Sequence, residues 1–410
     1  MTDHAHSSSP RPVVLASSLW LPRDHSWRRF PSVGLVLAAL GLGASLVGGL
    51  ASPAIRSQLW HSWLVGALFV LSIGLGGLFF VLVHHSTQAG WSVVVRRIGE
   101  NAMATLPWMA LLFVPLLVFG MGDLFHWTHA DAVAKDPLLQ HKQAYLNSTF
   151  FLIRTVAYFA IWTFLALRLG ALSRLQDKTG DHNLTRRMRR LSAPGLILFA
   201  LSVTFFAFDW VMSLDPHWYS TIFGVYFFAG SVMAFFAFMT LIALGQQVLL
   251  PRLVNEEHLH DITKLMFAFL VFWTYMAFSQ FMLIWYANLP EETGFFAQRL
   301  AGSWRPMSIA LALGHFVVPF FFLLPRTIKR SPKASTIAAL WLLAMHALDM
   351  YWLVMPSLHV GGITFSWLDA AALIGCIGVF LAVFGGSLRR QALVPLRDPR
   401  LPESITFENV

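Results

Sequence analysis

A few charged side chains lie inside long apolar stretches, where ionisable groups are uncommon, among them Arg154, Asp209 and Asp349. A charge within the hydrocarbon of a membrane costs several kcal/mol unless it faces a partner or a wet cavity, so such residues are candidates for function. Counted from the ends of their stretches, all three lie about 7 to 9 Å deep on the same side. Two carboxylates sharing one arginine would titrate differently, and one of them could carry a proton.

Two histidines inside apolar stretches are further candidates. His346 precedes Asp349 by three residues and so lies on the same helical face, and imidazole ordinarily titrates near about pH 6.5. His315 is about 14 Å into its stretch. Pro319, four residues later, cannot donate to the carbonyl of residue 315, so that oxygen is left open. A water molecule or a quinone headgroup could use both groups, although a lone histidine is more often a hydrogen-bond partner between helices.

The outer side carries three more titratable candidates near the ends of the apolar stretches. Asp215 and His217 lie in one turn, and Asp369 lies near the start of the last stretch. They could accept protons, but residues in turns are often only helix caps. A buried arginine and carboxylate can likewise serve only to fix the orientation of two helices.

Composition indicates which elements must position these residues. The chain is 57% hydrophobic and 12% charged, which excludes a water-soluble fold. Windows of about 20 apolar residues, enough to cross roughly 30 Å of hydrocarbon as a helix and too long for barrel strands, recur along the chain. We therefore predict an all-α integral membrane protein with ten transmembrane helices. The predicted spans are 31–51, 61–84, 102–122, 149–172, 194–214, 219–244, 265–288, 306–325, 335–355 and 367–386.

Basic residues concentrate in alternate loops, for example in the run Arg186–Arg190, and this pattern marks the cytoplasmic side. It explains the net charge of +9 without nucleic acid. Both termini are predicted to lie on the cytoplasmic side of a bacterial inner membrane. Residues 1–30 are then a cytoplasmic tail and not a cleaved signal. Residues 31–386 form the membrane domain, and 387–410 form a cytoplasmic C-terminal tail.

Metal and nucleotide chemistry find no support in the sequence. The single cysteine, Cys376, excludes an intrachain disulfide and a cysteine-ligated iron–sulfur cluster. Only His315 and His346 lie deep enough for haem ligation, and their depths differ. Walker-type, CxxC and HExxH motifs do not occur. We predict no catalytic metal, no covalent cofactor and no catalytic residue in this chain alone.

Three long motifs lie in the second half of the chain: FDWVMSLDPHWYSTIFGVYFFAGS at Phe208–Ser231, LPEETGFFAQRLAGSW at Leu289–Trp304 and HALDMYWLVMP at His346–Pro356. They resemble the F-subunit family of alternative complex III, a bacterial quinol:electron-acceptor oxidoreductase. The resemblance covers the chain from the second span onward and keeps the order and spacing of the motifs.

The resemblance implies an NrfD-like (polysulfide-reductase membrane-subunit) fold of two four-helix bundles, spans 2–5 and 6–9, flanked by spans 1 and 10. Asp209 and Asp349 would then fall in different bundles. It also implies partners: a homologous membrane subunit, an iron–sulfur subunit, cytochrome c subunits, lipid and menaquinol. The motif residues carried over are Asp209, Asp215, His217, His346 and Asp349, whereas Arg154 and His315 rest on their depth in the spans.

Four functional hypotheses remain open at this point. The first, which we favour, is a subunit whose outer carboxylates and histidines carry protons as menaquinol is oxidised in the complex. The second is a subunit that binds quinol itself, with histidine and aspartate as proton acceptors. The third is a purely structural scaffold. The fourth is a stand-alone secondary transporter, which would have inverted repeats.

Overall fold

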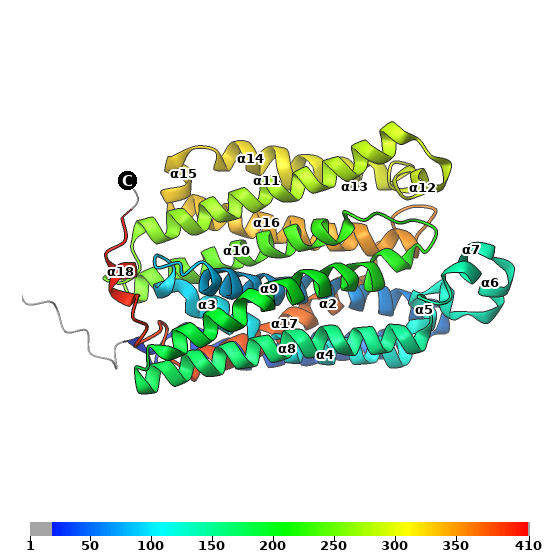
Figure 1. Ribbon diagram of the computed structural model, residues 1–410. Coiled ribbons are helices and arrows are strands. Elements are labelled where there is room, and N and C mark those ends of the chain that lie inside the picture. The colour runs from blue at the N-terminus through cyan, green and yellow to red at the C-terminus, as the bar shows by residue number, and fades with distance from the viewer. Residues whose placement is uncertain (1–18, 409–410) are drawn as a thin grey trace, which may run out of the picture.

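The computed structural model describes residues 19–408, which are helical and contain no strand (Figure 1). Within these residues ten helical segments are long and apolar enough to cross a membrane, as predicted. Eight of the ten are single helices: α1 (Phe30–Leu50), α2 (Pro53–Ser86), α8 (Ser148–Thr179), α9 (Asn183–Trp210), α10 (Phe223–Leu249), α11 (Glu256–Ala287), α16 (Pro332–Val354) and α17 (Trp367–Arg389).

Two spans are interrupted by a wide π-helical turn. The third consists of α3 (Val93–Met103), α4 (Leu106–Pro115), η3 (Leu116–Gly120) and α5 (Met121–Leu124). The eighth consists of α13 (Trp304–Leu311), η6 (Ala312–Val317) and α14 (Val318–Leu323). A proline accompanies each interruption, Pro115 at the end of α4 and Pro319 just after η6. Proline cannot donate a backbone hydrogen bond, which favours a local change of helical register.

Short helices lie at the two ends of the helical body (Figure 1). One end carries α6 (Ala130–Lys135), α7 (Pro137–Lys142) and α12 (Pro290–Arg299). The opposite end carries α15 (Arg326–Arg330) and α18 (Leu401–Ile405). The remaining short turns are η2 (Ser26–Arg29), η4 (His126–Thr128), η5 (Met212–Leu214) and η7 (Met355–Ser357).

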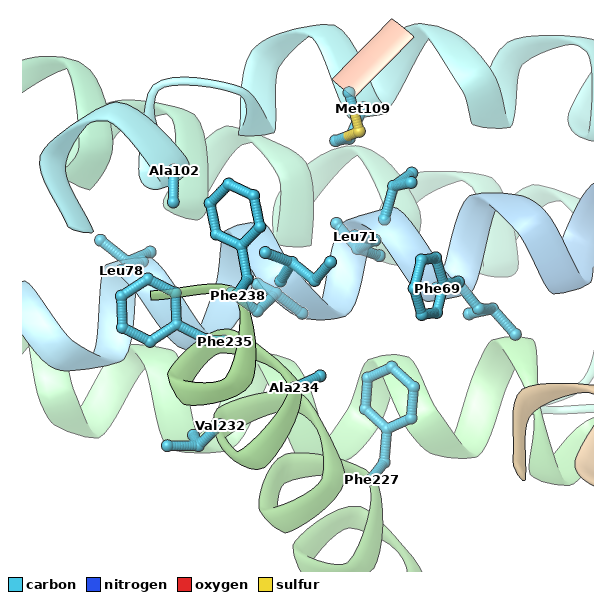
Figure 2. Packing of buried hydrophobic residues seen from close by; sticks show 14 of the residues in the cluster. Phe69, Leu71, Leu78, Ala102, Met109, Phe227, Val232, Ala234, Phe235 and Phe238 are labelled. Atoms are coloured by element: carbon cyan, nitrogen blue, oxygen red, sulfur yellow. The ribbon is translucent and has the colours of Figure 1, made fainter. Parts of the chain in front are cut away.

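Helices α2 and α10 form the middle of the molecule, and each is buried on nearly all sides. Figure 2 shows Phe69, Leu71 and Leu78 of α2 beside Phe235 and Phe238 of α10. Helix α2 also packs against α3, α4, α9, α16 and α17, and α10 packs against α9, α11 and α16. A helix that is apolar all round is expected at such a position, whereas the outer helices keep one apolar face for lipid.

Several helices extend beyond the predicted spans because polar residues at their ends are paired within the protein. Helix α3 begins at Val93, nine residues before the predicted start at residue 102. Its first turns contain Arg96, Arg97 and Glu100, which are buried in ion pairs. Charged residues lower the hydropathy of a segment, so the predicted span excluded them. The helix can still include them because their charges are paired within the protein.

The C-terminal segment that we predicted as a cytoplasmic tail is folded against the membrane domain over its described part. Leu393 and Val394 are buried, and the N–H of Leu393 donates to the carbonyl of Leu19 at 2.8 Å. The hydroxyl of Ser404 accepts from the N–H of Val94 at 3.1 Å, and the carbonyl of Ser404 lies 2.9 Å from Nε2 of His258. The segment therefore joins the starts of α3 and α11.

Helices α1 and α17 approach each other closely through glycine. A Cβ on Gly41 would lie 2.5 Å from the backbone nitrogen of Gly375, whereas a Cβ on Gly43 would meet nothing within 4 Å. We therefore expect Gly41→Leu to destabilise the protein by about 1–3 kcal/mol through overpacking. The matched variant Gly43→Leu should leave stability unchanged. Thermal unfolding of the purified protein in detergent measures both, and equal effects would contradict a close α1–α17 contact.

Candidate functional site

Asp349 is a buried carboxyl group that interacts with the side chains of Tyr226 and Trp273. It lies near the end of α16, and its side chain is fully buried. The hydroxyl of Tyr226 on α10 donates to Oδ1 of Asp349. The other oxygen, Oδ2, is buried and accepts no hydrogen bond of ordinary geometry among the described residues, although the indole of Trp273 lies close to the carboxyl. Buried polar atoms are nearly always hydrogen-bonded, so this weakly bonded oxygen needs an explanation.

Asp349 lines a cavity of about 510 Å³ between α10, α11, α16 and the segment α13–η6. We call it the Asp349 cavity. Most of its wall is apolar, and the polar groups on it are few and come from different helices. These are Tyr226, Trp273, Thr274, Tyr275, Gln280, Ser308, Asp349 and Trp352. A largely apolar cavity with a few converging polar groups is the usual form of a small-molecule site.

His315 lies in the π-helical turn η6, and its ring contacts that of Trp273, with 3.9 Å between the ring centroids and 32° between the ring planes. Neither ring nitrogen has a hydrogen-bond partner within residues 19–408. We predicted an open carbonyl at residue 315, but a side-chain donor is found one residue earlier. Nε1 of Trp341 donates to the carbonyl of Gly314 at 2.7 Å. A π-turn pairs residues five apart, so the missing N–H of Pro319 falls opposite Gly314.

His346 lies one turn before Asp349 but links α16 to α2. Its Nε2 lies 2.8 Å from the hydroxyl of Ser72, while Nδ1 is buried and has no partner in the described part of the chain. It is absent from the residues that line the Asp349 cavity. The side chain therefore forms a hydrogen bond between two helices and is not grouped with Asp349 at the cavity.

Among the described residues Arg154 forms an ion pair with Asp209 and not with Asp349, so the arrangement in which two carboxylates share this arginine is not found. Nε and Nη2 of Arg154 donate to the two oxygens of Asp209 at 2.8 and 2.9 Å. The hydroxyl of Tyr158 donates to the same carboxylate at 2.7 Å. The reason lies in the packing: α8 packs on α9, whereas α16 packs on α10 and α2. Asp209 has both oxygens occupied, which suits a structural ion pair.

Of the three candidates on the outer side, Asp369 is part of a helix cap, whereas Asp215 and His217 line a pocket. Asp369 accepts from Ser62 at 2.5 Å, from Gln58 at 2.7 Å and from the N–H of Ser366 in a capping box of α17. Asp215 and His217 instead line a separate pocket of about 210 Å³ at the end of the helical body that carries α12. Nε2 of His217 also lies 2.5 Å from Asp136, and this contact lowers the pKa of the Asp136 carboxyl.

Sequence reasoning missed Arg299, which lines the same outer pocket. Its guanidinium donates to the backbone carbonyls of Phe295, Trp352 and Leu353 and lies 3.4 Å from the ring centroid of Phe295. Burial lowers the pKa of Arg299 to about 9, so the group stays charged at neutral pH. The signal available was the motif at Leu289–Trp304, which contains this arginine.

Tyr226 and Trp273 were also missed, although Tyr226 lies within the motif at Phe208–Ser231. Tyrosine and tryptophan in a membrane span are usually interpreted as interfacial anchors. In the structure both are buried and line the Asp349 cavity.

The fold and the site define a multi-pass helical membrane protein with a buried carboxyl group beside a cavity. Among the residues that the structure describes, no group of three or more His, Cys, Asp or Glu side chains could hold a metal ion. No family model matches the chain, and no curated protein matches it.

Proposed function

We propose that this chain is a membrane subunit of a quinol:electron-acceptor oxidoreductase of the alternative complex III type, in which Asp349 carries protons released by menaquinol oxidation. The observation that supports this role for Asp349 is its carboxyl group, which is fully buried and has no ion-pair partner within residues 19–408. The membership in such a complex rests on the motifs at Phe208–Ser231, Leu289–Trp304 and His346–Pro356.

The helix contacts are compatible with two four-helix bundles. Helices α8, α9 and α2 pack together with α3 and α4, and α10, α11 and α16 pack together with α13 and α14. Helix α17 packs against α2, and α1 packs against α17. The end with α15 and α18 is the cytoplasmic one in this proposal, because the basic loops lie there, and the membrane is the bacterial inner membrane.

A proton leaving Asp349 would move toward the outer pocket. Leu353 lines that pocket and lies four residues from Asp349, or about 6 Å along the helix. Tyr226 bonds Asp349 and is within electrostatic reach of Arg299. The pocket offers Asp215 and His217 as groups that can take up the proton near the surface.

Partner subunits must supply the electron acceptor. The proposed partners are a homologous NrfD-like membrane subunit, an iron–sulfur subunit and cytochrome c subunits, so the chain by itself should not oxidise quinol. Metal-free proton transfer by carboxyl and hydroxyl groups is the chemistry available in the described residues.

The experiment that tests the proposal measures quinol:cytochrome c turnover and proton release on the purified complex carrying Asp349→Asn. We expect both rates to fall about tenfold or more, because an amide cannot take up and release the proton. Subunit content must first be shown to equal that of the wild type.

The matched control is Asp369→Asn, which changes another hydrogen-bonded carboxyl group near the same side of the membrane. Because Asp369 serves as a cap, this variant should assemble and turn over nearly as the wild type does. Unchanged rates in an assembled Asp349→Asn complex would reject the proton-carrier role. The structural-scaffold hypothesis would then be favoured over the proton-carrier hypothesis. The carboxylate of Asp209, whose two oxygens are both hydrogen-bonded, is consistent with such a structural role.

A further inference from the structure

We propose that a groove between α16 and α17 binds one acyl chain of an anionic phospholipid, whose phosphate lies against basic residues at the ends of the surrounding helices. We call it the α16–α17 groove. This inference goes beyond the proposed function, because the lipid site depends neither on Asp349 nor on a partner subunit.

The α16–α17 groove has a volume of about 310 Å³ and lies where α16 and α17 both pack against α2. Its floor is formed by buried residues of α2 and α10, among them Phe69 and Phe238 (Figure 2). Its walls are formed by α16 and α17, where Leu343 and Ile377 are partly exposed and Ala344 is exposed. The groove therefore opens sideways, toward the hydrocarbon that surrounds the spans.

The chemistry of the groove favours an acyl chain over water or a helix. Every side chain that lines it is apolar, so a water molecule would find no hydrogen-bond partner there. One turn of a helix, with a diameter of 10–12 Å and a pitch of 5.4 Å, occupies about 400–600 Å³, which is more than this groove holds. An acyl chain is thinner than a helix and needs no hydrogen bond.

Three of the four helices around the groove end in exposed basic residues at the end of the helical body that carries α15 and α18. Lys333 lies in the first turn of α16, Arg252 follows the end of α10, and Arg389 and Arg390 end α17. None of these four side chains forms an ion pair within residues 19–408. Basic residues beside a membrane attract anionic headgroups, so a lipid phosphate would supply the missing negative charge.

Lys333 lies on the face of α16 that lines the groove. Ala344 and Ala347 follow it by about three and four helical turns, so the three side chains lie on one stripe of the helix. Lys333 and Ala344 are about 16 Å apart along α16, which is close to half of the roughly 30 Å of hydrocarbon in a bilayer. A headgroup at Lys333 would therefore place its acyl chain at the depth of the groove.

The test is photolabelling of the full-length chain in phosphatidylcholine nanodiscs that contain a small amount of phosphatidylglycerol with a diazirine in one acyl chain. We expect mass spectrometry to find the label on the peptides of α16 and α17 that contain Ala344 and Ile377. Excess phosphatidylglycerol should displace the label about fivefold or more better than excess phosphatidylcholine, because each basic residue at the headgroup favours the anionic lipid.

Two pairs of variants separate the groove from the charge. Ala344→Phe should fill the groove and remove most of the labelling, whereas Ala200→Phe, at an exposed alanine of α9 outside the groove, should label as the wild type does. Lys333→Gln with Arg252→Gln should lower the preference for phosphatidylglycerol about tenfold or more. Arg189→Gln with Arg190→Gln, which removes two exposed charges from α9, should keep the preference.

Four results would overturn the proposal, provided that each variant elutes as a monodisperse protein. Equal displacement by the two lipids would mean that the groove takes any acyl chain. Equal loss of preference in the two charge variants would mean that the whole basic surface attracts the lipid. Labelling of Ala344→Phe at the level of Ala200→Phe would place the lipid outside the groove. Labelling of the isolated chain that is lost in an assembled complex would show that a partner subunit covers the groove.

Discussion

Replacing Arg154 by alanine is expected to destabilise the protein by about 3–5 kcal/mol, because it leaves the carboxylate of Asp209 buried without its cation. Asp209 is fully buried and takes two of its three side-chain hydrogen bonds from Arg154. The variant also removes a cation–π contact, since the guanidinium carbon lies 3.8 Å from the ring centroid of Tyr145. The effect is measured by thermal unfolding in detergent, with the loss of monodisperse protein as the readout.

The control for this prediction is Arg168→Ala, on the same helix, where the arginine is exposed. That change should cost less than about 0.5 kcal/mol. The paired change Arg154→Met with Asp209→Leu should recover much of the lost stability, since it removes both charges together. An Arg154→Ala protein as stable as Arg168→Ala would show that the ion pair does not hold α8 on α9.

Replacing Arg97 by alanine is expected to have a comparable effect at the other end of the molecule. Arg97 is fully buried, donates to Glu100 at 2.7 Å and to Ser173 at 3.2 Å, and pairs with Asp177. Its removal leaves Asp177 without its cation and leaves Glu100 with Arg96 alone, which costs about 3–5 kcal/mol. Because Asp177 also accepts from the N–H of Leu396 at 2.8 Å, the C-terminal segment should loosen as well.

Hydrogen exchange measures this loosening directly. In the Arg97→Ala protein, amides of residues 390–408 should exchange at least about tenfold faster, whereas those in the middle of α10 should keep their protection. The control is Arg390→Ala, an exposed arginine at the end of α17, which should leave the exchange of this segment unchanged. Equal exchange in the two variants would mean that the ion cluster does not hold the segment.

The pairing of Arg154 with Asp209 could be anticipated from the sequence because both lie at the same depth in consecutive spans. Consecutive helices are usually neighbours in space, so a charge on each at matched depth tends to meet. The same reasoning failed for Asp349, which has equal depth but lies on a helix that packs elsewhere. The sequence position of a residue gives its depth in the membrane. It does not tell which helix lies next to it or toward which side its own helix turns the side chain.

The sequence by itself determined the ten helical spans and the positions of the ionisable residues within them. Both follow from the local run of apolar residues, because a backbone in hydrocarbon must satisfy its own hydrogen bonds. Only the tertiary structure decided that Tyr226, 123 residues away, bonds Asp349 and that this carboxyl group lies beside a cavity. Such a cavity depends on how four helices pack, and no local pattern specifies the space that their side chains leave unfilled.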